Sequence, residues 1–344
     1  MDGSNSGVMR LLRLLRPALI CSVVLLQTPP SHAQSQQSSP PPHGTIRVRV
    51  DRVNVGVTVT DAQGRFVEGL HREDFLVFDN GTRQPLTDFV AVEEPAQVLL
   101  LIEAGPAVYL LEGGHLQAAY SLLNGLSTGD RVAVVKYADA PLTIIDFTPD
   151  KDAAAAALGE LRFNLGFGSL NLSSSLSTVL DWLTKVNGKK TVVLLSTGVD
   201  TSPSNEWSVL LQRLKTSDVR ILAVSLTGEL RSPQSNRKKK TSSDNPASAS
   251  AQFDEADRLL KWIAEATGGR AYFPRSAKEF SAVYAEIAQL VRHEYSLAFA
   301  PAVHDGKIHS IEVRVSPAAS ADTSTPNYRV DHRQAYLAPR PDPQ

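Results

Sequence analysis

The sequence predicts an α/β fold: a doubly wound, mainly parallel sheet that is flanked along the chain by an N-terminal and a C-terminal β segment. Between residues 97 and 292, strand-like and helix-like patterns alternate, which is typical of a parallel sheet with helices on both faces. On either side of this block, apolar and polar residues alternate at a period of two, as in half-buried strands. We therefore expect a β-rich module over residues 45–92, an α/β domain over 97–292 and a C-terminal β segment over 293–338.

The two flanking segments carry clear strand and turn signals. Four valines at alternate positions between residues 53 and 59 would lie on one face of a strand. Further along, Asp79-Asn80-Gly81 follows an apolar run, and Asn-Gly between such runs is a strong signal for a tight hairpin. Near the other end, residues 295–299, 308–315 and 328–336 predict about three more strands.

The α/β block opens with an apolar run over residues 97–102, as expected of a parallel strand that helices cover on both faces. Further strands are predicted at 131–137, 142–147, 190–196, 219–226 and 270–273. Helices are predicted at 112–126, 152–161, 171–187, 204–216, 254–267 and 277–292. Residues 231–252 hold almost no apolar side chain, and we interpret them as a disordered insert.

The first residues have the pattern of an export signal. An arginine-rich start precedes an apolar run over residues 17–26, which has the length of a signal-peptide core and is too short to span a bilayer. The small residues Ser31 and Ala33 then offer a cleavage site. We therefore predict a signal peptide over residues 1–33, a flexible linker over residues 34–44, and a secreted or periplasmic mature chain without a membrane span.

Composition excludes several classes of protein. The 344 residues include 35 Lys and Arg against 36 Asp and Glu, a formal net charge of -1, which gives no support for binding to nucleic acid. The single cysteine, Cys21, excludes an internal disulfide framework and a cysteine-based zinc site. Because Cys21 lies within the predicted signal peptide, the mature chain would be free of thiols, as suits an oxidising compartment.

Two short motifs that match catalytic patterns occur in the wrong structural context. Gly125-Leu126-Ser127-Thr128-Gly129 fits the G-x-S-x-G pattern, which requires a strand before the turn and a helix after it. Here a predicted helix ends before the motif and a strand follows it. The S-x-x-K motif Ser235-Asn236-Arg237-Lys238 lies in the polar insert, where nothing would hold a nucleophile in place. We therefore expect a protein that is not an enzyme.

Several segments match a known family in the order in which they occur. They include Val53–Asp61, Asp79–Gly81, Lys190–Gly198, Asp200, Thr267–Gly269, Asp305–His309 and Arg333–Tyr336. With the order of the blocks, they give the chain a resemblance to the secreted bacterial VWFA-related proteins. In that family a von Willebrand factor type A domain lies between two β segments. The resemblance implies a type A domain at the centre of this chain.

The resemblance also implies a candidate site. Type A domains often carry a metal-ion-dependent adhesion site, in which an Asp-x-Ser-x-Ser loop, a distant Thr and a further Asp hold Mg²⁺. The matching positions here are Glu103, Gly105 and Ala107 around Pro106, then Ser169 near the Thr and Thr197 at the second Asp. Because Mg²⁺ requires oxygen donors in a nearly octahedral arrangement, these replacements predict no required metal or other cofactor. Weak Mg²⁺ binding by Glu103 and Ser169 is the alternative.

Asp200 completes the set of candidate binding residues. It follows the strand at 190–196 and could donate an oxygen, although a cap for the helix that begins near Pro203 is the simpler role.

We therefore predict a non-enzymatic, extracytoplasmic module that binds an unidentified protein. Ligands of doubly wound sheets bind at the carboxyl ends of the strands, so the loops after Ile102, Leu165 and Leu195 would make the contact. Two alternatives stay open. One is a Mg²⁺-dependent adhesion receptor with a reduced metal site, and the other is a structural or assembly component of the cell envelope.

Overall fold

A computed structural model describes residues 52–92, 95–105, 114–161, 169–201, 204–231, 246–316 and 327–340. The predicted signal peptide and linker, residues 1–44, lie outside these ranges. None of the helices in the described ranges is long and apolar enough to cross a membrane.

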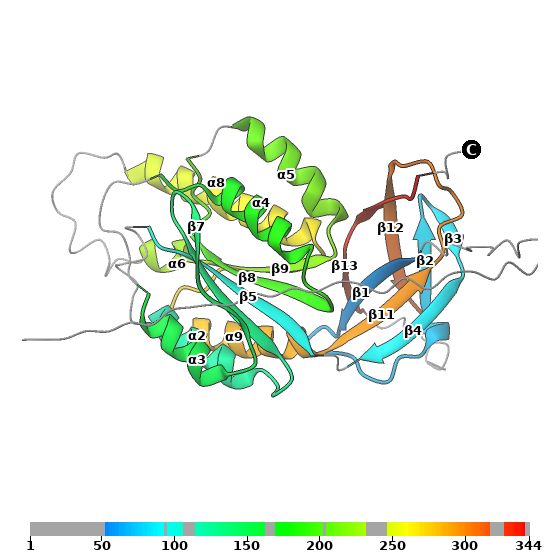
Figure 1. The fold of residues 1–344 in the computed structure, drawn as a ribbon, viewed down its shortest axis with the longest axis horizontal. Coiled ribbons are helices and arrows are strands. Elements are labelled where there is room, and N and C mark those ends of the chain that lie inside the picture. The colour runs from blue at the N-terminus through cyan, green and yellow to red at the C-terminus, as the bar shows by residue number, and fades with distance from the viewer. Residues whose placement is uncertain are drawn as a thin grey trace, which may run out of the picture. The chain divides into compact units, whose positions relative to one another are not determined.

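The centre of the chain forms one six-stranded sheet with the strand order β10-β9-β8-β5-β6-β7 (Figure 1). Neighbouring strands pair in parallel, except that β7 runs antiparallel to β6. The strands are β5 (Ala96–Glu103), β6 (Arg131–Tyr137), β7 (Pro141–Thr148), β8 (Lys189–Ser196), β9 (Val219–Ser225) and β10 (Ala271–Tyr272). The mainly parallel α/β sheet that the sequence predicted is confirmed.

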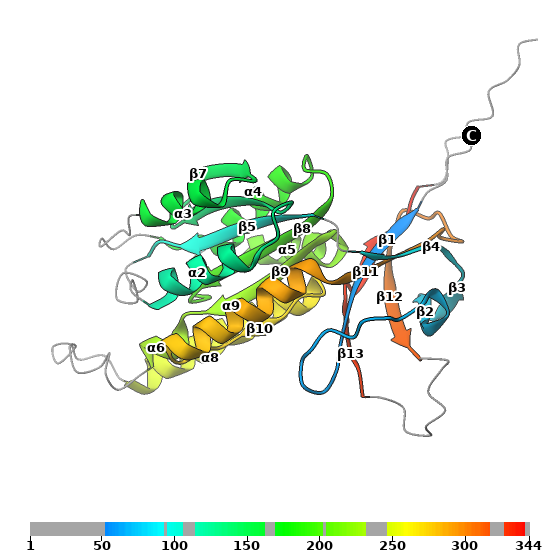
Figure 2. The same ribbon diagram turned by 90° about the horizontal axis from the view of Figure 1, so that it is seen from below.

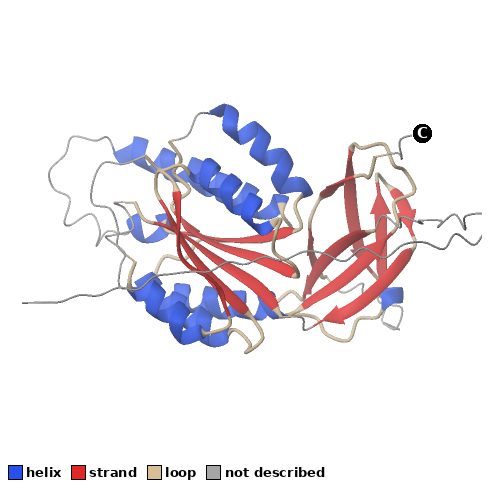
Figure 3. Ribbon diagram, viewed as in Figure 1, coloured by secondary structure: helices blue, strands red, loops and turns tan. Residues whose placement is uncertain are grey.

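Helices cover both faces of this sheet (Figures 1 and 3). One face packs against α2 (Gly114–Gly125), α3 (Lys151–Gly159) and α9 (Ala277–Arg292). The opposite face packs against α4 (Leu172–Leu183), α5 (Ser204–Thr216) and α8 (Pro246–Ala266). A short helix, α6 (Thr227–Leu230), follows β9. The arrangement is the doubly wound one.

The strand β5 shows why its sequence is an uninterrupted apolar run. Val98, Leu100 and Ile102 belong to the core under α2, α3 and α9. Leu99 and Leu101 belong to the core under α4, α5 and α8. All five side chains are fully buried, because successive residues of a strand point to opposite faces and both faces are covered.

The two flanking segments build two further antiparallel sheets together (Figure 2). In the first, β1 (Val53–Thr60) pairs with β11 (Glu294–Phe299) and β13 (Arg329–His332), and β11 pairs with β4 (Leu86–Val92). In the second, β12 (Ile308–Val315) pairs with β2 (Phe75–Asp79) and β14 (Ala335–Leu337), and β2 pairs with β3 (Thr82–Gln84). Segments expected as separate β blocks therefore share both sheets.

A common apolar core joins these two sheets. The alternating valines of β1 all point into it and are at most 6% exposed. Tyr295 and Phe299 of β11 enter the same core. The predicted hairpin is also confirmed: Asn80 and Gly81 join β2 to β3 with φ angles of 46° and 79°, the left-handed conformation that a tight hairpin requires.

The predicted boundary that differs most from the structure is the start of α8. Residues 231–252 were expected to form a disordered insert, but α8 already begins at Pro246. Residues 246–251 are a proline followed by alternating alanine and serine. These small residues follow a polar segment, so the sequence resembled a continuation of the loop. Proline is favoured in the first turn of a helix and alanine has the highest helix propensity, so the local sequence also suits a helix start.

Candidate functional site

Three polar side chains meet at the carboxyl edge of the central sheet because they end three adjacent strands. Glu103 ends β5, Tyr137 ends β6 and Ser196 ends β8. Glu103 lies opposite Tyr137 in the register of β5 and β6, and Ile102 lies opposite Leu195 in that of β5 and β8. The parallel pairing therefore brings the three strand ends to the same point of the sheet.

The carboxylate of Glu103 accepts hydrogen bonds from all of its polar neighbours at this edge. Its Oε2 accepts from the backbone N–H of Thr197 at 2.7 Å, and the hydroxyls of Ser196 and Tyr137 lie 3.0 Å and 3.2 Å from it. These two hydroxyls are 2.6 Å apart, so one of them donates to the other while the other donates to Glu103. The Thr197 hydroxyl lies 3.0 Å from Oε1 and 2.9 Å from Oε2. Glu103 is fully buried, so the whole carboxylate is held inside the protein.

Burial governs the protonation of this group. Loss of water raises the pKa of Glu103, while hydrogen bonds from Thr197, Ser196 and Tyr137 oppose the rise because they favour the charged form. The pKa of Tyr137 is also raised well above its usual range, first by burial and then by the nearby charge of Glu103. Tyr137 therefore stays a neutral phenol that can donate to the carboxylate.

Gly105, the first small residue of the candidate loop, lies against the side chain of Leu170. A Cβ atom on Gly105 would lie 2.9 Å from Cδ2 of Leu170, closer than real Cβ atoms approach their neighbours. A serine at residue 105 would therefore require Leu170 to move. Leu170 is held by Thr201, whose hydroxyl accepts from the Leu170 N–H at 2.9 Å and whose N–H donates to the Leu170 carbonyl at 2.7 Å.

Asp200 holds two helices together. Its Oδ1 accepts from the backbone N–H of Leu172, the first residue of α4, at 3.2 Å. Its Oδ2 accepts from Nε1 of Trp207 in α5 at 2.6 Å. Pro203, near which the sequence predicted a helix capped by Asp200, lies outside the described residues, so this capping stays a prediction. Among the described residues, Asp200 contacts the first N–H of α4, which lies beside the loop after β8 only in the folded chain.

The described polar groups at this edge do not suit the coordination of a magnesium ion. Both oxygens of Glu103 face hydroxyl or amide donors, and the hydroxyl of Thr197 is used in bonding Glu103. Mg²⁺ requires several oxygen acceptors around one point. Within the described ranges, no group of three or more His, Cys, Asp or Glu side chains could hold a metal ion.

The structure gathers most of the predicted binding residues. Glu103 and Thr197 bond each other, Gly105 lies against Leu170, and Ser169 is exposed in the loop that contains Leu170. Pro106 and Ala107 lie outside the described residues.

Sequence reasoning missed Tyr137, Ser196 and Leu170. Tyr137 and Ser196 end predicted strands, but their meeting with Glu103 depends on the strand order, which the chain order does not reveal. Leu170 gave no signal, because its role depends on the glycine at residue 105.

The fold and this edge define a class: a doubly wound α/β domain whose strand-end loops surround a buried polar cluster. Residues 115–263 match the family model of the von Willebrand factor type A domain. The protein therefore contains a type A domain, a kind of domain that generally serves as a protein-binding module. No curated protein matches the sequence.

The chain is similar to several solved structures at low sequence identity. A von Willebrand factor type A protein from Catenulispora acidiphila is 12% identical with a TM-score of 0.44, over 78% of this chain and 74% of that chain. The protein BatB from Bacteroides thetaiotaomicron is 10% identical with a TM-score of 0.41, over 57% of this chain and 98% of that chain. The manganese-loaded TRAP protein of Plasmodium vivax is 15% identical with a TM-score of 0.42, over 78% of this chain and 100% of that chain.

Proposed function

We propose that the protein is a non-enzymatic binding module that contacts a protein partner through the strand-end loops of its type A domain, without a required metal. The observation that carries this proposal is the hydrogen bonding of Glu103. A carboxyl group that is hydrogen-bonded by Thr197, Ser196 and Tyr137 finds its polar partners within the protein itself. Its buried oxygens therefore have hydrogen-bond partners without a cation.

The loops at this edge are suited to present a fixed surface. Backbone hydrogen bonds join Thr201 to Leu170, and Asn171 to Ala138, so the loops after β6 and β8 hold the loop before α4. Ser169 and Thr201 are exposed on this rim. A surface whose backbone is already ordered loses less conformational entropy on binding than a loose one.

We propose further that this contact takes place outside the cytoplasm. The support is the signal-like pattern of residues 1–33 and the absence of any cysteine after Cys21. The test is the mass of the mature protein recovered from culture medium or periplasm. We expect the mass of a chain from which a signal peptidase has removed residues 1–33.

A capture experiment tests the binding function. The mature protein, immobilised, is exposed to solubilised envelope and secreted proteins with either EDTA or added Mg²⁺, and bound proteins are identified by mass spectrometry. We expect the same partner under both conditions. Ser169→Arg, which places a charged bulk on the exposed rim, should reduce capture about tenfold or more, because steric and charge mismatch at an interface costs several kcal/mol.

The matched control is Asn187→Arg, which adds the same charge at an exposed residue between α4 and β8, next to the amino end of β8. Capture should be unchanged in this variant. Loss of the partner in EDTA would show instead that an ion completes the site.

A further inference from the structure

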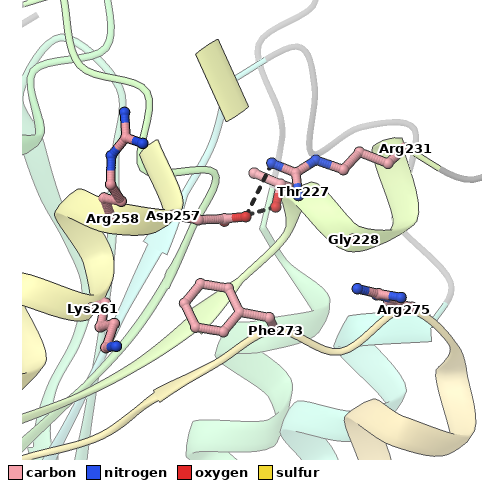
Figure 4. A pocket seen from close by; sticks show the side chains of 8 residues that line it. All are labelled: Thr227, Gly228, Arg231, Asp257, Arg258, Lys261, Phe273 and Arg275. Atoms are coloured by element: carbon pink, nitrogen blue, oxygen red, sulfur yellow. Dashed lines mark hydrogen bonds and ion pairs between the residues drawn. The ribbon is translucent and has the colours of Figure 1, made fainter. Parts of the chain in front are cut away.

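A cationic pocket opens at the same edge of the sheet, two strands away from Glu103. Ser225 at the end of β9 lies opposite Ser196 at the end of β8, so the ends of β8 and β9 are neighbours. The pocket has a volume of about 750 Å³. Charged and aromatic side chains line it: Arg231, Asp257, Arg258, Lys261, Phe273 and Arg275 (Figure 4).

The carboxylate in this pocket is already compensated. Oδ1 of Asp257 accepts from the Ser225 hydroxyl at 2.7 Å and from the Thr227 hydroxyl at 2.8 Å. Its Oδ2 pairs with Arg231 at 3.1 Å. These contacts hold the carboxylate of Asp257 in place within the pocket lining. The other cations of the lining, Arg258, Lys261 and Arg275, are then available to a ligand.

Those remaining cations are accessible. Lys261 is 62% exposed and lies 3.8 Å from Glu265, and Arg258 is 70% exposed beside Glu255. Exposed ion pairs of this kind contribute little to stability, so a ligand carboxylate can replace the partner. Within the described part of the chain, the guanidinium of Arg275 makes no hydrogen bond or ion pair.

An aromatic side chain lies among these cations. Phe273 is 38% exposed, and Figure 4 shows its ring between Lys261 and Arg275. Gly228 fixes this part of the wall, because a Cβ at residue 228 would lie 2.3 Å from the carbonyl oxygen of Pro274. The segment that carries Phe273 and Arg275 therefore packs directly on α6.

We propose that this pocket binds a short acidic peptide segment of a protein partner, with an apolar side chain on Phe273 and carboxylates at Lys261 and Arg275. Charge complementarity selects the occupant, and the exposed ring selects a segment with an apolar residue between acidic ones. The volume is far larger than one phosphate ion needs.

This proposal rests on the proposed function, since it gives a chemical class to a partner of the strand-end edge. Its test needs no natural partner. The probe is the fluorescein-labelled peptide acetyl-Glu-Asp-Glu-Leu-Phe-Glu-Asp-Glu-amide, and binding to the purified mature protein is followed by fluorescence anisotropy. The comparison peptide replaces every Glu by Gln and every Asp by Asn, so that only the charge is removed.

We expect saturable binding of the acidic peptide and at least about tenfold weaker binding of the amide peptide. Lys261→Glu and Arg275→Glu should each weaken binding of the acidic peptide about tenfold, and Phe273→Ala about threefold or more. Lys185→Glu is the matched control, since Lys185 is exposed beyond the end of α4 and does not line the pocket. Its binding should stay within about twofold of wild type.

Equal binding of both peptides, no binding of the acidic peptide, or equal loss in Lys185→Glu would overturn the proposal. Tryptophan fluorescence of each variant verifies that it is folded. The proposed function fails separately, by the loss of captured partner in EDTA or by unchanged capture with Ser169→Arg, so the two failures are distinguishable.

Discussion

At the scale of single residues, Glu103 determines what the site can do. A glutamate at this position reaches the hydroxyls of Thr197 and Ser196 and the phenol of Tyr137, and its carboxylate is fully buried among them. Hydrogen bonds from three residues then occupy the acceptor positions that a metal ion would use. The sequence predicted no required metal from the missing donors, and the hydrogen bonds of Glu103 are a separate observation that supports this hypothesis.

Glu103→Gln tests this role through stability. The amide would turn a donor toward the hydroxyl and N–H donors, so we expect a loss of about 1–3 kcal/mol in the free energy of unfolding. Urea unfolding followed by tryptophan fluorescence measures it, because all three tryptophans, Trp182, Trp207 and Trp262, lie in helices of the α/β domain. Glu160→Gln, at an exposed residue, should change stability by less than about 0.5 kcal/mol.

The stability difference between wild type and Glu103→Gln should depend on pH, and the raised pKa of Glu103 gives the sign of that dependence. Burial raises the pKa of Glu103 above its ordinary value of 4.5, so its contribution to stability is complete below that pH and is lost as the pH rises through the raised pKa. Glutamine does not titrate. The difference in stability between wild type and Glu103→Gln should therefore shrink as the pH rises above 4.5 and passes through the raised pKa of Glu103. A difference that grows with pH would contradict the raised pKa.

At the scale of elements, the sequence predicted where the strands and helices of the α/β domain lie along the chain. It did not predict which elements contact one another in the fold. The helix at 204–216 and the strand at 131–137 have the predicted bounds, because amphipathic and apolar periodicities are local properties of the chain. The start of α8 was missed because small and polar residues fit both a loop and a helix. The contact of Asp200 with the start of α4 was not predicted, because that N–H belongs to a segment that is distant along the chain.

Asp200→Ala tests how the helices α4 and α5 are held. It leaves the first N–H of α4 and the indole N–H of Trp207 without their carboxylate, so we expect a loss of about 1–2 kcal/mol in unfolding free energy. Asp200→Asn keeps one oxygen acceptor and should lose less. Asp152→Ala, at an exposed residue in the first turn of α3, is the control and should lose no more than about 0.5 kcal/mol. Equal stability of Asp200→Ala and wild type would remove Asp200 from this role.

At the scale of the whole molecule, each of the two antiparallel sheets contains strands from before and from after the α/β domain. β1 lies beside β11 and β13, and β2 lies beside β12, although more than two hundred residues separate these partners. Strand alternation predicted each segment but not this pairing, since period two reveals which face is buried and not which strand is adjacent. Along the chain, the type A domain therefore lies between two groups of strands that pair with each other in the same sheets.

We propose that the type A domain binds its partner without a metal ion, and calorimetric titration of the mature protein with Mg²⁺ and Mn²⁺ measures whether it holds one. We predict no saturable heat with either ion for wild type or for Glu103→Gln. Saturable binding by wild type at micromolar metal concentration that disappears in Glu103→Gln would contradict the claim, because Glu103 would then be an ion ligand and not the centre of a hydrogen-bonded cluster.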